Sequence, residues 1–184
     1  MDDRARYGQA LALHYAAAWK SQGVPRRLGM GPEVSPGFHV LEFAFSHRAG
    51  CAYATSGMAT AASPIEVHLL APRPDAAHVE LLTAIAHYHQ TGASLGVGHT
   101  VNFGRAWLPG SSCTHGLISR PYLDGPSLEE WRGPDREVAA RCLWLIPITA
   151  SEREYRVKHG LAALEERFEA ARLDYLNPFR AGVV

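Results

Sequence analysis

Residues 141–152 read Arg-Cys-Leu-Trp-Leu-Ile-Pro-Ile-Thr-Ala-Ser-Glu, and this stretch decides the fold. Its first eight residues form the most apolar run of the chain, which predicts a central strand of a sheet. Thr149 and Glu152 then have the spacing of a capping box, in which a Thr hydroxyl and a Glu carboxylate satisfy backbone N–H groups where a helix begins. Ser151 with Glu154 offers a second such pair. The stretch therefore predicts a buried strand that runs directly into a helix.

Outward from this stretch, hydrophobic periodicity predicts the remaining elements. Downstream, Gly160 is expected to divide the chain into helices 151–159 and 161–173. Upstream, apolar residues at helical spacing predict helices at 2–20 and from Asp75, as N-cap, to about Thr91. A loop rich in Gly and Pro is expected at 23–36. Strands are predicted at 40–45, 51–55, 65–70, 100–103 and 117–123.

The order of these elements predicts an α+β domain with helices packed on a mainly antiparallel sheet. The connections between the first three strands are short, as in an antiparallel meander. In the strand at 65–70, residues 65–69 alternate apolar and polar side chains, so we expect one apolar and one polar face. With 184 residues, the chain is expected to form a single domain over residues 1–184.

The composition limits the kinds of partner that the chain is expected to bind and the cellular compartment in which it is expected to lie. Lys plus Arg balance Asp plus Glu, so the chain has no net charge and we expect neither nucleic acid nor a membrane as its partner. Cys51, Cys113 and Cys142 are far apart and odd in number, which favours a reducing compartment. No segment has the apolar length of a membrane span, and the opening Met-Asp-Asp-Arg lacks the charge of a signal peptide. We therefore expect a cytoplasmic protein.

Ten histidines raise the hypothesis of a metal site. His87 and His89 are two residues apart, so on a helix they diverge by about 200° and do not meet at one ion. His39, His47 and His68 lie on separate strands or turns. The spacing therefore predicts no metal and no cofactor.

The run from Gly96 to Thr100, Gly-Val-Gly-His-Thr, has two interpretations. Its backbone could hold an anion, with His99 as a general base. It matches neither the P-loop nor the dinucleotide-binding fingerprint, however. The favoured interpretation gives Gly96 and Gly98 positive φ angles in a tight turn, with His99 hydrogen-bonded inward.

Other candidate nucleophiles lack a catalytic context. Ser111, Ser112 and Cys113 lie near His115, but in a Pro-Gly-Ser-Ser loop without a nucleophile elbow. The acidic pairs 129–130 and 165–166 are expected on the solvated faces of helices. The residues therefore predict that the chain is not an enzyme.

Five blocks of sequence, in order, resemble the Suppressor of fused family over residues 38–168, with residues 1–36 as an additional N-terminal helix and loop. The resemblance implies a Suppressor-of-fused-like domain in which the motif residues hold the structure. The blocks are the Gly57-Met58 turn, the Glu66 strand, the helix at 80–88, the turn at His99, and the run containing Pro147, Thr149, Glu152 and Gly160.

This resemblance implies a protein-binding function and no cofactor. The animal member has a further domain that clamps a transcription-factor peptide, and we expect this chain to hold only the shared domain. Single-domain bacterial relatives are thought to include immunity proteins that bind and neutralise toxins. One departure is that Ala59-Thr60 follow Gly57-Met58, where the family commonly has Ser or Asp.

Our leading hypothesis is thus a non-catalytic protein-binding domain, of the immunity type, that neutralises a toxin by stoichiometric binding. An exposed sheet edge could accept a strand of the partner. Trp107, Tyr122 and Trp131 are the candidate anchors, because they lie in or beside loops and are expected outside the apolar stripes of the core. A structural or regulatory homo-oligomeric domain is the alternative. A hydrolase that uses His99, Glu66 and His68 has the least support.

Overall fold

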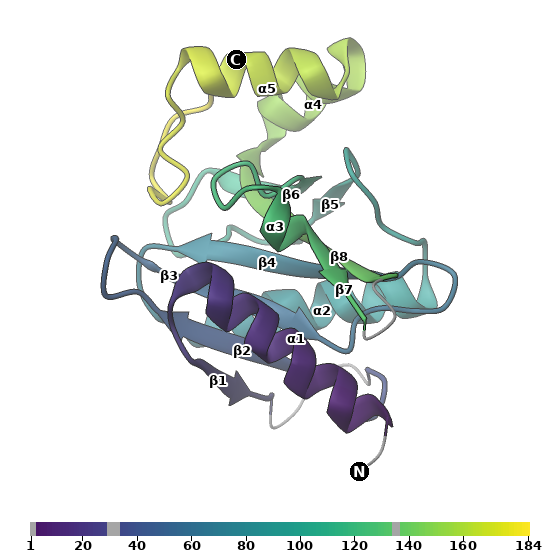
Figure 1. The fold of residues 1–184 in the computed structure, drawn as a ribbon. Coiled ribbons are helices and arrows are strands. Elements are labelled where there is room, and N and C mark those ends of the chain that lie inside the picture. The colour runs from purple at the N-terminus through teal and green to yellow at the C-terminus, as the bar shows by residue number, and fades with distance from the viewer. Residues whose placement is uncertain (1–2, 29–33, 134–136) are drawn as a thin grey trace.

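A computed structural model describes residues 3–28, 34–133 and 137–184. Within them, eight strands form one sheet in the order β1-β2-β3-β4-β8-β6-β5, and β7 pairs with β8 off this path (Figure 1). The strands are β1 Gly23–Arg26, β2 His39–Ala44, β3 Cys51–Ser56, β4 Ile65–Ala71, β5 Thr100–Asn102, β6 Cys113–Ser119, β7 Glu130–Arg132 and β8 Val138–Thr149. The helices are α1 Asp3–Trp19, α2 Ala76–Thr91, α3 Pro126–Glu129, α4 Ala150–His159 and α5 Leu161–Ala170.

The sheet is antiparallel at every described pairing except one. Strands β4 and β8 run parallel, with Ile65 opposite Arg141 and His68 opposite Trp144. The second half of β8 pairs with β6 in the antiparallel direction, with Leu117 opposite Ile146. The predicted α+β class with a mainly antiparallel sheet is confirmed, and so is the central position of the apolar run.

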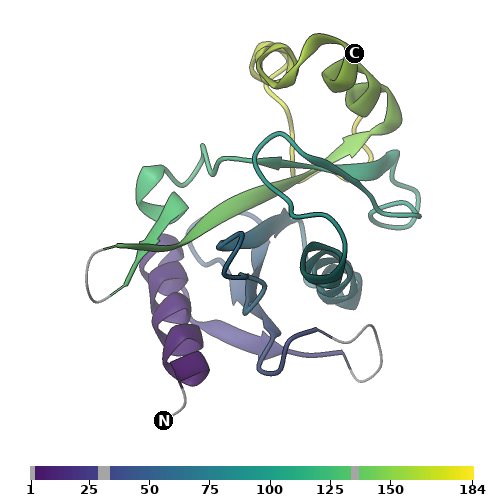
Figure 2. The same ribbon diagram turned by 90° about the vertical axis from the view of Figure 1, so that its right-hand side faces the viewer.

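Helices α1 and α2 cover opposite faces of the sheet (Figure 2). On the α2 face, Leu82 and Ile85 belong to one core cluster with Val67. On the α1 face, Tyr15 stacks on Trp19 at 5.0 Å between ring centroids, and Trp19 meets the edge of Phe43 at 4.8 Å. Each face of the sheet therefore has its own apolar core.

The predicted strand-to-helix junction is confirmed. The Thr149 side chain accepts a hydrogen bond from the Glu152 backbone N–H, and the Glu152 carboxylate accepts one from the Thr149 N–H. Helix α4 therefore begins at Ala150, and the second candidate pair at Ser151 is not used as the cap. Gly160, with φ of 90°, separates α4 from α5 as predicted. The Asp75 cap of α2 is also confirmed.

Several boundaries differ from the sequence prediction. Residues 23–26 form edge strand β1 where a loop was predicted, because an edge strand that is mostly exposed carries no apolar alternation. Strand β6 begins at Cys113 and ends at Ser119, so the predicted strand at 117–123 was placed too late. Helix α3, strand β7 and the end of α5 at Ala170 were also not anticipated.

The polar face of β4 is a further difference. Glu66 and His68 were expected on a polar face, yet both are completely buried, and the other residues of β4 are buried too. Helix α1 covers that face, since His68 lies against Trp19 with 5.4 Å between the ring centroids. Alternating polarity along a strand therefore does not show that the polar face is exposed to solvent, because a helix can pack on that face.

None of the described helices is long and apolar enough to cross a membrane. Among the described residues, no three His, Cys, Asp or Glu side chains are grouped as a metal site would require.

Candidate functional site

Strand β5 is the open edge of the sheet opposite to β1 (Figure 1). The Phe103 N–H donates to the Thr114 carbonyl at 3.0 Å, and the Ile118 N–H donates to the His99 carbonyl at 2.9 Å. Hydrogen-bonded positions alternate in an antiparallel pair, so the backbone groups of Thr100 and Asn102 point away from β6. The edge therefore presents backbone donors and acceptors to an incoming strand.

A groove of about 310 Å³ lies between this edge and α2. Apolar side chains from both elements line it, and Tyr88 is 48% exposed. Gly116 of β6 makes room for one wall, because a Cβ at this position would lie only 2.7 Å from the Phe103 ring. The lining residues are Leu81, Ala84, Ile85, Tyr88, Thr100, Val101, Asn102 and Phe103.

The opposite edge is less suited to strand addition. Pro25 in β1 has no N–H to donate, which interrupts any ladder that an added strand could form. Arg26 pairs with Glu42 across β1 and β2 at 3.1 Å. A larger hollow, about 950 Å³, lies between α1 and the β1–β2 edge and is lined mostly by small residues such as Gly8 and Ala12. Of the two edges, β5 combines open backbone groups with apolar walls.

Glu66 is buried beneath the turn that follows β3. Its carboxylate accepts hydrogen bonds from the Thr55 hydroxyl at 2.6 Å and the Tyr7 hydroxyl at 2.9 Å. It also accepts from the backbone N–H groups of residues 57–59. Complete burial raises the pKa of Glu66, and these hydrogen bonds offset part of the rise. Glu66 therefore holds the turn in place.

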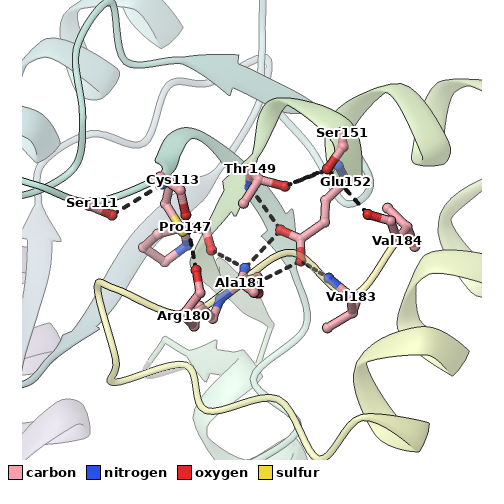
Figure 3. A network of polar contacts seen from close by, with 11 residues as sticks. Ser111, Cys113, Pro147, Thr149, Ser151, Glu152, Arg180, Ala181, Val183 and Val184 are labelled. Atoms are coloured by element: carbon pink, nitrogen blue, oxygen red, sulfur yellow. Dashed lines mark hydrogen bonds and ion pairs between the residues drawn. The ribbon is translucent and has the colours of Figure 1, made fainter.

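Glu152 is buried at the junction of β8 and α4, where the C-terminal segment returns to the sheet (Figure 3). Arg180 binds its two carboxylate oxygens at 2.6 and 2.8 Å and also donates to the Pro147 carbonyl at 2.9 Å. Burial alone would raise the pKa of Glu152, but the hydrogen bonds from Arg180 and the Thr149 backbone outweigh it and lower the pKa. The pair fastens the C-terminal segment to the sheet.

The structure places two of the three predicted anchors in the core. Trp107 is 4% exposed, and its indole N–H donates to His78 at 3.3 Å. Trp131 is 9% exposed and meets the edge of the Tyr7 ring. The expectation that these residues lie outside the core is wrong, because loop and edge-strand tryptophans fold back onto apolar surface. Tyr122 is 59% exposed.

The residues proposed for a hydrolase do not share a cleft. Glu66 and His68 are buried in β4, whereas the His99 side chain is exposed. Gly98 has the expected positive φ of 84°, whereas the positive φ expected of Gly96 is wrong. The inward hydrogen bond expected of His99 is wrong as well, because the described side chain faces solvent. The Cys113 thiol is buried, and burial raises its pKa, which disfavours the reactive thiolate.

The acidic residues predicted on solvated helix faces divide between two environments. Glu129 is 9% exposed and pairs with Arg141, so its assignment to a solvated face is wrong. Glu166 is exposed on α5. The residues of the β5 groove were not identified from sequence. The one feature of the sequence that indicates this groove is Tyr88, whose large ring lies outside the buried stripe of α2.

Comparisons with known proteins agree with this fold. A family model described as Suppressor of fused protein (SUFU) matches residues 38–181. A Neisseria gonorrhoeae protein described as a SUFU homologue has a similar structure, with a TM-score of 0.87, 31% identity and coverage of 98% of each chain. The chain belongs to the Suppressor of fused family.

More distant structures share the fold. A Sufu–Fu complex matches with a TM-score of 0.73 and 13% identity, covering 96% of this chain and 92% of the other. Drosophila Suppressor of Fused matches with a TM-score of 0.68 and 13% identity over 96% of this chain. This chain spans 51% of the Drosophila chain. A search of curated proteins found no match.

Proposed function

We propose that this chain is a non-catalytic protein-binding domain that accepts an extended segment of its partner at the β5 edge. The observation that carries the proposal is the backbone of Thr100 and Asn102, which faces outward beside the apolar groove. In strand addition, backbone hydrogen bonds supply affinity, and pockets for alternate side chains supply specificity. A relative of the same fold is described in complex with Fu, which supports a protein partner for this chain as well.

The partner that we propose is a toxin, neutralised by stoichiometric binding in the manner of an immunity protein. A Neisseria gonorrhoeae relative that matches this chain over 98% of both lengths supports a role for this domain in bacteria. We place the encounter in the cytoplasm, because all three cysteines are buried as free thiols. The organisation of residues 1–184 as one domain is part of this proposal.

Tyr122 is proposed as a second contact. It lies beside Leu123, which is 46% exposed, so two neighbouring large apolar side chains face solvent. Its hydroxyl donates to Glu165 of α5 at 3.4 Å, and this bond restrains the ring. Tyr is among the residue types that interfaces favour as anchors. Trp107 and Trp131 have little surface left to offer a partner.

The test uses a photo-crosslinking residue in place of Tyr88, expressed in the native host. We expect one dominant partner protein crosslinked in a 1:1 ratio. Asn102→Pro removes an outward N–H without removing a bond to β6, and it should abolish the crosslink. Asn102→Ala keeps the N–H and should retain it.

Circular dichroism of both variants checks that the fold survives. Equal crosslinking by Asn102→Pro and Asn102→Ala would overturn strand addition at β5. A crosslink to a second copy of this chain would replace the partner proposal with the homo-oligomeric alternative.

A further inference from the structure

The side of β5 that faces away from the groove is bordered by positive charge. Arg153 and Arg156 are three residues apart on α4, so they share one face of that helix. Arg156 lies against the turn that leads into β5, since its Nη2 atom is 3.2 Å from the position of a Cβ on Gly98. We call Arg153 and Arg156 the basic strip.

His115 of β6 lies near Arg153 of the basic strip. It is opposite Asn102 in the β5–β6 register, so its side chain and that of Asn102 point to the same side of the sheet. Burial lowers the pKa of His115, and the nearby charge of Arg153 lowers it further, so the imidazole is neutral at neutral pH and the positive charge belongs to the two arginines. The basic strip therefore runs beside β5 and β6, with Arg156 against Gly98 and Arg153 near His115.

The basic strip lacks acidic partners in the part of the chain that the structure describes. Neither arginine forms an ion pair there, and the buried Nε of Arg156 has no hydrogen-bond partner. On the groove side, by contrast, Arg105 is paired with Glu80 at 2.6 Å. The one acidic residue between the two arginines on α4 is Glu154, which is turned about 100° from Arg153 around the helix axis.

The two sides of β5 thus differ in chemistry. Side chains of a strand alternate between the two faces of a sheet. In a strand added to β5, the residue opposite Val101 would enter the apolar groove beside α2. The residues opposite Thr100 and Asn102 would face the side of the basic strip. An added strand lies about 4.8 Å from β5, so its side chains fall within a Debye length of that charge.

We propose that the partner segment alternates apolar and acidic residues, with the apolar side chains in the groove and the carboxylates toward the basic strip. This inference rests on the proposed function, because it specifies the segment that the β5 edge accepts.

The experiment measures fluorescence anisotropy of three labelled octapeptides against the purified chain. One alternates Val and Glu, one Val and Lys, and one Ser and Glu. We expect the Val–Glu peptide to bind most tightly. Asn102→Pro should remove its binding, whereas Asn102→Ala should keep it.

Arg156→Gln should raise the dissociation constant of the Val–Glu peptide about two- to fivefold, as expected for one partly exposed ion pair. Arg167→Gln is the matched control: it removes the same charge from α5, where the guanidinium lies over the Tyr155 ring. It should leave the dissociation constant unchanged. Added salt should reduce the difference between Arg156→Gln and the unmodified chain.

Three outcomes separate the inference from the proposed function. Equal binding of the Val–Lys peptide would overturn the charge preference and leave strand addition intact. Binding of none of the peptides, with the Tyr88 crosslink still formed and still lost in Asn102→Pro, would overturn the inference alone. If no peptide binds and the Tyr88 crosslink does not form either, the proposed binding site at β5 is itself overturned.

Discussion

The guanidinium of Arg180 and the carboxylate of Glu152 form a two-pronged pair across 28 positions of sequence, with N–O distances of 2.6 and 2.8 Å. Both side chains are almost completely buried. The Val183 N–H donates to the same carboxylate at 3.1 Å, so the C-terminal segment is fixed by several bonds to one residue. Glu152 thereby serves both the start of α4 and the attachment of residues 180–183.

Arg180→Met is expected to lower the free energy of unfolding by about 3–5 kcal/mol, because it leaves a buried carboxylate without its cation. Urea denaturation at neutral pH measures the change. Arg172→Met, at an exposed position nearby, should stay within about 0.5 kcal/mol of the unmodified protein. Similar losses in both variants would show that the pair does not act as the structure indicates.

His68→Leu is expected to make the protein less sensitive to acid. Burial first, and then the charge of Arg48, lower the pKa of His68 to about 3, so the folded state keeps it neutral. The unfolded chain takes up the proton near pH 6.5, and stability is therefore lost progressively as the pH falls from 6.5 toward 3. At pH 5 the loss is about 2 kcal/mol.

The measurement for His68 is urea denaturation at pH 7.5 and at pH 5. His68→Leu should reduce the difference in unfolding free energy between the two conditions by about 2 kcal/mol. His99→Leu, at an exposed site, should keep the difference found in the unmodified protein. An unchanged difference in His68→Leu would mean that the buried imidazole is protonated at pH 5.

Glu66→Gln is expected to cost about 1–3 kcal/mol, although the two side chains have the same shape. The amide places an NH₂ group where the carboxylate accepts hydrogen bonds from Tyr7, Thr55 and backbone N–H groups. Thermal or urea unfolding measures the cost. The exposed Glu166→Gln supplies the control, and an equally small effect at both positions would contradict the donor arrangement.

Gly50→Ala is expected to destabilise the protein more than Gly37→Ala. The two glycines have nearly the same φ, 85° and 89°, so both substitutions place alanine in an unfavourable backbone conformation. A Cβ on Gly50 would also lie 2.5 Å from the Ala71 carbonyl oxygen, whereas one on Gly37 meets no atom within 4 Å. The additional contact should cost about 1–3 kcal/mol by urea denaturation, and equal costs would disprove it.

Local sequence predicted the elements whose signal lies within a few residues. The capping box at Thr149, the cap at Asp75 and the break at Gly160 each depend on neighbours along the chain, and all three are confirmed. The apolar run of β8 was equally clear, because a strand covered on both faces carries apolar residues at nearly every position.

Features that depend on distant contacts could not be predicted in the same way. Glu66 and His68 are buried because α1, some fifty residues upstream, covers them. Trp107 and Trp131 are buried through contacts with His78 and Tyr7. The candidate groove likewise requires that α2 and β5 lie side by side, which no local pattern specifies. In the same way, local sequence does not show that Arg156 of α4 lies against Gly98, at the turn that leads into β5.

The parallel pairing of β4 with β8 has a consequence for how fast the chain can fold. Ile65 meets Arg141 only after the intervening segment has been looped back, and that segment contains α2, β5, β6 and β7. Closing so long a loop costs chain entropy before the contact repays it. The meander of β2 to β4 involves short loops and should form first, with β8 docking late and limiting the rate. Refolding kinetics would show this as a single slow phase that substitutions in β8 prolong.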